Sequence, residues 1–412
     1  MMAMPDLHGV SAEVFRESVL AWVACRRQSG TESPAYALSA IAPQPTLMSL
    51  CFAVLTAELF GALPEAAERV RTVQVLTSAQ DAESGLFVDP CLTVDDLEPT
   101  SPGIDYLLHQ TTYFALNALD ALSARPSYSL RFADPYLQPA FLEGWLRKLD
   151  WSNPWKECNR AMFIATALYT RYCWWNDPDA LAALHGLLDW LDQHQDPDTG
   201  LWGTREGASL LHAMAGAYHL LPFYFALRRP IYLCEKILAS TLSLQRPDGL
   251  FHPQGGGDAC LDVDAVGILA WCSLTTPNRA AQVQMALGRA FQGILANWSE
   301  EGGFCRARLR SWPAKSWRRR IAEMFGLDRI LRKPYRRHPQ VMYYEGWRKM
   351  PFDIRQPDLW STWFRSYGLA VVSTRLPGTF LDGVPWRFRR LPGLGWYDEA
   401  AIMDTYAESY PA

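Results

Sequence analysis

Three aspartates lie close together where a glycine-rich loop runs into an apolar segment, and their spacing suits acid chemistry. The glycines at 255–257 are followed by Asp258, Asp262 and Asp264. A single Asp caps a helix N-terminus and meets the positive end of its dipole. Three exceed that need, and the Ala-Val-Gly-Ile-Leu-Ala-Trp segment that follows is too apolar for a solvated helix end. Burial beside a like charge raises a carboxyl pKa, so one of these groups could hold a proton near neutral pH.

A metal site is weighed at the same place. Asp258 and Cys260 have the spacing of two zinc ligands in protein prenyltransferase catalytic subunits, which they resemble. Zinc there also needs a downstream His and an open position. The only His after Cys260 in the sequence is His338, next to a proline in a basic segment. Asp-Asp-x-x-Asp, the pattern for magnesium-assisted diphosphate ionisation, is also missing from the sequence. We therefore expect no metal and no cofactor.

Aromatic and histidine side chains are candidates for the wall of a site. Aromatic residues make up 13% of the chain, which indicates either many rings packed between helices or a ring-lined cavity. His212 and His219 are seven residues apart, so they share one face of a helix. Histidines on an apolar helix face are usually buried core residues that form hydrogen bonds. If the helix is an inner one, they can instead line the cavity. The expected substrate-binding residues are His219, Tyr218, His212, Trp202, Trp155, Trp360 and Trp363.

Helices must position these residues, because apolar residues recur at helical spacing throughout the chain and strand-like alternation is almost absent. Proline and glycine fall between the periodic segments. The sequence therefore predicts an all-α protein. The expected helices cover 14–27, 47–60, 106–122, 160–174, 180–194, 210–227, 231–244, 264–274, 280–296 and 359–374.

A turn pattern recurs along the chain at intervals of roughly fifty residues, the length of two helices with their turns. Each copy ends a helix with Gln or Asn, continues with acidic residues, and reaches a Gly followed within two places by an aromatic residue. Gly supplies a backbone with positive φ, and the aromatic ring fills the gap between neighbouring hairpins. The pattern predicts a ring or solenoid of helical hairpins. The four copies are 80–87, 195–202, 245–251 and 297–304.

These turns resemble the QW motif of the terpenoid cyclase and protein prenyltransferase superfamily. The resemblance spans roughly residues 45–305, with a possible extension to 375. It implies an α/α toroid, with inner and outer helices around a central cavity. We expect a single toroid domain over 1–412.

The aspartate pair adds a resemblance to class II terpene cyclases, which carry Asp-x-Asp-Asp on an inner helix. Asp262 and Asp264 match the first two acidic positions, and Ala265 stands where the third would be. The resemblance implies that Asp264 is the general acid that protonates an isoprenoid and that Asp262 is its partner. The cation formed would need a dry cavity with aromatic faces. An isoprenoid lipid is the expected small-molecule partner.

Two alternatives stay open. Toroids of helical hairpins also carry glycosidases, lyases and epimerases, in which Trp stacks on sugars and paired carboxylates do acid–base work. Asp262 and Asp264 are too close in sequence to flank a glycosidic bond, so Glu206 or Glu345 would have to face them. The other alternative is a scaffold without catalysis, whose centre is filled by its own rings and holds no pocket at Asp264.

A basic insertion interrupts the toroid pattern near 306–340. Residues 306–337 carry twelve Lys or Arg and two acidic residues, with Trp, Ile, Phe and Leu interleaved. It is interpreted as a solvated amphipathic helix, as a helix that seats the protein on anionic lipid, or as an anion clamp. The Pro- and Gly-rich tail from residue 376 onward is expected to wrap the surface.

Composition and charge bear on whether the protein binds nucleic acid, spans a membrane, is secreted or contains disulfides. A net charge of −4 gives no overall footprint for nucleic acid, and no apolar run reaches the roughly 18–20 residues of a membrane span. The first residues lack the features of a signal peptide. The nine cysteines include no Cys-x-x-Cys pair, which indicates reduced thiols. We expect a cytoplasmic protein, with peripheral membrane binding through 306–337 as one interpretation.

Overall fold

The protein is almost entirely helical. The computed structural model describes residues 10–30, 32–308 and 341–409. The α-helices are α1 (Ala12–Ala24), α2 (Leu47–Leu59), α3 (Ala66–Ser78), α4 (Ile104–Ala121), α5 (Pro139–Leu146), α6 (Pro154–Trp175), α7 (Pro178–His194), α8 (Leu210–Ala226), α9 (Cys234–Ser243), α10 (Ala259–Thr275), α11 (Ala280–Leu295), α13 (Leu359–Arg375) and α14 (Glu399–Ser409). Strands β1 (Val341–Tyr343) and β2 (Pro351–Asp353) pair antiparallel. The predicted all-α class is confirmed.

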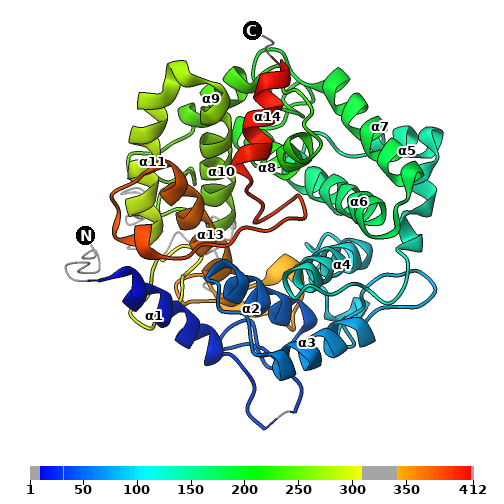
Figure 1. The fold of residues 1–412 in the computed structure, drawn as a ribbon, viewed down its shortest axis with the longest axis vertical. Helices are drawn as coiled ribbons and strands as arrows, with labels where there is room; N and C mark the ends of the chain where they lie inside the picture. The colour runs from blue at the N-terminus through cyan, green and yellow to red at the C-terminus, as the bar shows by residue number, and fades with distance from the viewer. Residues whose placement is uncertain (1–9, 31, 309–340, 410–412) are drawn as a thin grey trace, which may run out of the picture.

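Six helices form a closed inner ring. Helices α2, α4, α6, α8, α10 and α13 each contact the next in this order, and α13 contacts α2 (Figure 1). Outside them, α1 packs on α2, α3 on α4, α7 on α6, α9 on α10, and α11 on both α10 and α13. The expected α/α toroid is therefore the fold.

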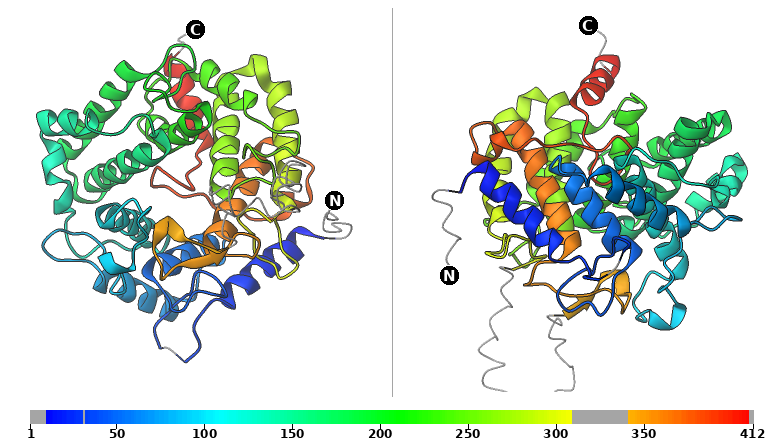
Figure 2. Two further views of the ribbon diagram at one scale, coloured as in Figure 1. Left: turned by 180° about the vertical axis from the view of Figure 1, so that it is seen from behind. Right: turned by 60° about the horizontal axis from the view of Figure 1, so that its bottom comes forward.

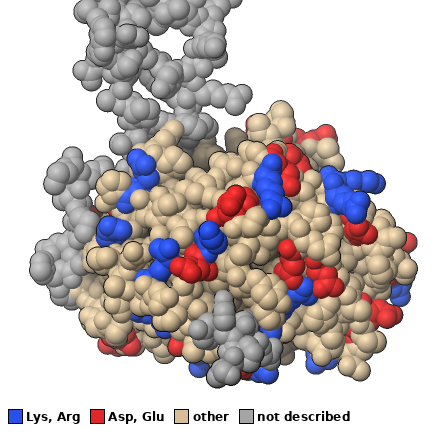
Figure 3. Space-filling view, turned by 90° about the horizontal axis from the view of Figure 1, so that it is seen from above, with Lys and Arg blue, Asp and Glu red and all other residues tan. Residues whose placement is uncertain are grey.

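The two layers differ because their helices differ in polarity. Along α8, every residue from Ala213 to Phe225 is buried, as expected for a helix covered on all sides. Along α7, buried apolar residues follow helical spacing and polar residues occupy the other face. On the face shown in Figure 3, acidic and basic side chains lie interspersed over the surface. Amphipathic helices thus separate the apolar inner ring from solvent.

The repeated turns brace the ring. In three of them the side-chain amide of Gln donates to the carbonyl of the turn glycine, at 2.8–3.0 Å: Gln80 to Gly85, Gln195 to Gly200 and Gln245 to Gly249. In the fourth, Asn297 donates instead to the carbonyl of Gly293, at 3.0 Å. The aromatic residue of each turn is buried: Phe87, Trp202, Phe251 and Phe304.

The turn glycines also permit close contact with neighbouring segments, and two of them show it well. A Cβ on Gly249 would lie 2.3 Å from the carbonyl oxygen of Arg289 in α11, and one on Gly302 would lie 2.3 Å from that of Ser18 in α1. Their φ angles are +82° and +105°. The Gly302 contact joins the last hairpin to the first helix and helps to close the outer layer.

The C-terminal tail corrects one expectation. Instead of wrapping the surface, residues 384–398 run across one end of the ring (Figures 1 and 2). Leu394 and Trp396 are buried there. The Tyr113 hydroxyl accepts from the Leu394 N–H at 2.6 Å, and the Tyr367 hydroxyl donates to the Trp396 carbonyl at 2.7 Å. The Pro and Gly residues correctly indicated that this segment is irregular. The segment is nevertheless buried at the centre of the ring, because it carries apolar side chains at positions 391, 394 and 396.

Most of the predicted basic insertion lies outside the described residues. Only 306–308 of the 306–340 segment belong to the described part, so its three interpretations stay predictions. In the part of the chain that the structure covers, none of the helices has the length and apolar character that crossing a membrane requires.

Replacing Gly249 by Ala should destabilise the fold by about 3–5 kcal/mol, because a strained backbone adds to a clash with the Arg289 carbonyl. Gly30 is the matched control: its φ is +79°, yet a Cβ there meets nothing within 4 Å, so Gly30→Ala should cost only about 1–2 kcal/mol. Urea unfolding measures both free energies. Equal losses for the two variants would contradict the role given to the Gly249 contact.

Candidate active site

A cavity of about 920 Å³ occupies the centre of the ring. Five inner helices each contribute two residues, spaced by four positions, or by seven in α8, so that both face inward. These pairs are Tyr106 and Gln110 of α4, Trp155 and Asn159 of α6, His212 and His219 of α8, Cys260 and Asp264 of α10, and Trp360 and Phe364 of α13. Leu394 of the tail also lines it, and so does the 341–346 segment.

Asp264 carries the unusual chemistry of this cavity. Its side chain is fully buried, and neither carboxyl oxygen has a hydrogen-bond partner among the described residues. Burial raises the pKa of Asp264 well above its ordinary value, and the negative charges of Asp258 and Asp262 raise it further. An unpartnered carboxyl in such surroundings is neutral and holds its proton.

Asp262, two residues earlier, has the opposite environment. Its carboxylate accepts from the backbone N–H of Phe251 and of Asp258, both at 2.9 Å. Arg365 of α13 lies 3.2 Å away, and both side chains are 0% exposed. Burial raises the pKa of Asp262 to about 6, against the lowering effect of Arg365. Asp262 is therefore ionised at neutral pH and does not line the cavity.

The internal repeat explains this division of roles. The backbone N–H of the turn aromatic donates to an inner-helix side chain in three turns: Phe87 to Thr112, Phe251 to Asp262, and Phe304 to Thr362. Asp262 thus occupies the place of a structural threonine. Two residues later the other units carry Phe114 and Phe364, where this unit carries Asp264. Asp264 is an acid at a position that the repeat otherwise fills with a ring.

The three glycines before α10 allow the loop backbone to pack closely against the Asp262 carboxylate. Gly255, Gly256 and Gly257 have φ angles of +76°, +72° and +73°. A Cβ on Gly257 would lie 2.3 Å from an Asp262 carboxylate oxygen. The loop therefore requires glycine to bring its backbone against the buried carboxylate.

Asp258 forms the cap that the sequence allowed. It precedes α10, and its carboxylate accepts from the Cys260 N–H at 3.2 Å. Its other oxygen pairs with Arg306 at 3.0 Å. Burial raises the pKa of the Cys260 thiol well above its ordinary value. Among the described residues no three His, Cys, Asp or Glu side chains are grouped to hold a metal, and His338 lies outside them.

The structure brings some of the predicted binding residues together and places others elsewhere. Trp155, His212, His219 and Trp360 line the cavity with Asp264. His219 is buried, which lowers its pKa to about 3, so its imidazole is neutral. Partial burial also lowers the pKa of His212.

Tyr218, Trp202 and Trp363 do not line this cavity. Tyr218 stacks on Trp271 at 5.0 Å between ring centroids, and Trp363 stacks on Phe52 at 6.2 Å. The indole of Trp202 donates to the Leu191 carbonyl, and the residue lines an outer hollow with Glu206. Each of these three rings packs between helices, the structural alternative for aromatic residues.

Charged residues and several further rings also line the cavity; the charged residues are Glu98, Lys156, Arg306 and Glu345. Sequence reasoning did not assign Arg306 or Tyr106 to it, and it named Glu345 only for the carbohydrate alternative. Cys260 and Phe364 could have been found, because each lies four residues from a predicted cavity residue on the same helix. No sequence pattern indicated that residues of the 341–346 segment would line the cavity.

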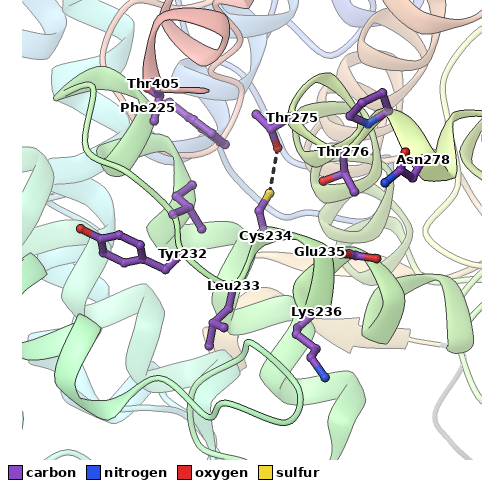
Figure 4. Close-up of a pocket in the computed structure, with 12 residues that line it drawn as sticks. Phe225, Tyr232, Leu233, Cys234, Glu235, Lys236, Thr275, Thr276, Asn278 and Thr405 are labelled. Atoms are coloured by element: carbon purple, nitrogen blue, oxygen red, sulfur yellow. Dashed lines mark hydrogen bonds between the residues drawn. The ribbon is translucent and has the colours of Figure 1, made fainter. Parts of the chain in front are cut away.

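A second hollow of about 380 Å³ lies beside α9 and holds none of the predicted site residues. It is lined by residues of the α8–α9 connection, by the end of α10 and by Thr405 of α14 (Figure 4). The Cys234 sulfur there lies 3.1 Å from the Thr275 hydroxyl oxygen. Asp264, the buried carboxyl without a hydrogen-bond partner among the described residues, lines the central cavity instead.

Asp262→Ala should destabilise the protein by about 3–5 kcal/mol, because Arg365 then stays buried without its counter-charge. Glu143→Gln is the matched control: Glu143 pairs with Arg147 on the exposed surface of α5, and its loss should cost less than about 1 kcal/mol. Chemical unfolding measures both. A loss for Asp262→Ala as small as that of the control would show that the ion pair does not hold the site.

Comparison with known proteins finds likeness in solved structures alone. No protein-family model matches the chain, and no curated protein does. The type II terpene cyclase MstE from Scytonema, without ligand, is 15% identical, with a TM-score of 0.47, and the match covers 89% of this chain and 98% of that one. A variant of that enzyme in complex with geranylgeranyl dihydroxybenzoate, its substrate, is 13% identical, with coverage of 89% and 97% and a TM-score of 0.42. The chemistry that follows is argued from this chain's own residues.

Proposed function

We propose that the protein is a class II terpene cyclase-like enzyme in which Asp264 protonates an isoprenoid substrate and so starts its cyclisation. The observation that carries the proposal is the state of the Asp264 carboxyl, which is buried, without a hydrogen-bond partner among the described residues, and on the wall of the central cavity. A neutral carboxylic acid held in this way is a proton donor for a substrate that offers no better base than an alkene.

Proton transfer follows from this arrangement. The Asp264 O–H bond breaks, its proton bonds to one alkene carbon, and the other alkene carbon becomes a carbocation. A neighbouring double bond of the same chain then attacks that carbon and closes a ring. Asp262, held ionised by Arg365, is the positioning partner, because its fixed negative charge keeps the proton on Asp264 until the alkene takes it.

The cavity wall suits the cation that results. Trp360 and Phe364 stack at 4.7 Å between centroids, and Tyr344 lies 5.6 Å from Trp360. A cation over an aromatic face gains roughly 0.5–2 kcal/mol per ring. Trp155 and Tyr106 extend the ring-lined surface. His219 and His212 are the further contacts that we propose for the substrate.

This proposal is favoured over the two alternatives. A scaffold filled by its own rings leaves no hollow at Asp264, whereas the cavity there measures about 920 Å³. For carbohydrate chemistry, Glu206 lies on the outer hollow, whereas Glu345 shares the cavity with Asp264. The cyclase is favoured because the Asp264 carboxyl has no hydrogen-bond partner among the described residues and because Trp360, Phe364 and Leu394 line the cavity with it. Delivery of the lipid substrate at a membrane surface through 306–337 is part of the proposal and rests on the sequence.

Asp264→Asn should lower turnover by about 10²–10⁴-fold, because the amide cannot supply the proton. The enzyme is incubated in D₂O buffer with squalene, farnesyl and geranylgeranyl diphosphates, and geranylgeranyl dihydroxybenzoate, and products are analysed by mass spectrometry. The wild type should give a cyclised product with one deuterium. Asp179→Asn, an exposed change on α7, is the control and should keep full turnover. Unchanged turnover in Asp264→Asn, or no product from any substrate with the wild type, would refute the proposal.

The pH dependence of kcat should follow the proton on Asp264. Because burial raises its pKa well above the ordinary value, the acid stays protonated across the neutral range, and turnover should fall as the pH rises through that raised pKa. Initial rates across a pH series measure this. Turnover that increases with rising pH would indicate that the group acts as a base.

A further inference from the structure

Glu345 enters the cavity from outside the inner ring. It belongs to the turn Tyr344–Gly346, which directly follows β1. The β1–β2 segment and the C-terminal tail lie at opposite ends of the ring: the tail is in front in Figure 1 and the strands are in front in the rear view of Figure 2. Glu345 and Asp264 thus share one cavity but come from different parts of the fold.

The backbone holds Glu345 in an unfavourable conformation. Its φ and ψ are 49° and 28°, in the left-handed region that residues with a Cβ rarely adopt. The turn is fixed by hydrogen bonds from the Tyr344 N–H to the Met350 carbonyl at 2.9 Å and from the Glu98 N–H to the Gly346 carbonyl at 2.8 Å. Strain of this kind persists where the surrounding structure enforces it, and it gathers at functional sites.

The surroundings of Glu345 favour a carboxylate with enhanced proton affinity. Burial raises the pKa of Glu345. The positive charge of Arg306 and a hydrogen bond from Gln110 lower this pKa and so stabilise the ionised form. The other basic groups of the wall suit proton removal less well. The imidazole of His219 has a pKa of about 3, partial burial lowers the pKa of His212 as well, and Glu98 is paired with Arg348 at 2.6 Å.

Resting on the proposed function, we propose that Glu345 is the catalytic base that ends the reaction by removing a proton from the final carbocation. Its carboxylate oxygen takes a hydrogen from the carbon next to the cationic centre. The C–H bond breaks, and its electron pair forms a C=C bond that neutralises the cation. Glu345 becomes a neutral acid while Asp264 is a carboxylate, so the substrate is isomerised without net gain or loss of a proton. Exchange with water then restores both groups.

Glu345→Gln tests this assignment, because the amide keeps the size of the side chain and cannot accept the proton. In D₂O with the substrate that the wild type converts, the variant should still consume it and incorporate deuterium from Asp264. The share of the wild-type alkene should fall at least about tenfold, replaced by alcohols from water capture or by other alkene isomers. Glu345→Asp, which keeps a carboxylate, should restore part of the wild-type alkene.

The controls separate the two proposals. Glu143→Gln makes the same exchange on the outer surface and should leave the products unchanged. Gln110→Met removes an amide that lowers the pKa of Glu345 and whose Nε2 donates to the neighbouring Tyr344 hydroxyl at 3.4 Å, and it should shift the products in the same direction even where Glu345→Gln does not fold. A wild-type product profile from Glu345→Gln, or from Gln110→Met when it is the only folded variant, overturns the role of Glu345 and leaves the protonation step standing. No conversion by the wild type overturns the protonation step itself, and the role of Glu345 with it.

Discussion

The site depends on one constraint: of two fully buried carboxyl groups two residues apart, only the one that has a cation and hydrogen-bond donors beside it is readily charged. Asp262 takes the charge, because Arg365 and two backbone N–H groups stabilise it. Asp264 has none of these partners among the described residues and stays neutral. The same anion joins the 245–251 turn, the glycine loop and α13, so the interaction that sets the protonation state also holds the wall of the cavity together.

The repeat shows how such a site can arise from a structural element. A turn N–H meets a side-chain oxygen on an inner helix in several units, and threonine is enough where only a hydrogen bond is needed. Replacing threonine by aspartate adds a charge, and the ring then needs a cation on the neighbouring helix. With the charge in place, an acid two positions later keeps its proton, as the proposed function requires. The proposed chemistry would then be a local modification of a repeated structural contact.

Sequence patterns predicted the inner ring and its acid because both leave local signals. Apolar residues at helical spacing marked all six inner helices, and the Asp262–Asp264 pair was too acidic for its apolar context. Short or weakly apolar helices escaped, among them α3, α5 and α14, and α10 begins at Ala259 rather than 264. Tyr218, Trp202 and Trp363 could not be assigned from sequence, because one helix turn decides whether a ring faces the centre or a neighbour. The position of Glu345 at the cavity depends on contacts between segments that are distant in sequence, so no local sequence pattern could predict it.

The course of the C-terminal tail has a consequence for substrate size. Leu394 forms part of the cavity surface at the end that the tail crosses, and its backbone N–H meets the Tyr113 hydroxyl. On the proposed function, an irregular segment rather than the helix that carries Asp264 would limit how far a substrate extends at that end of the cavity. Substrate size and acid would then depend on separate stretches of the polypeptide, so that one could vary while the other is kept.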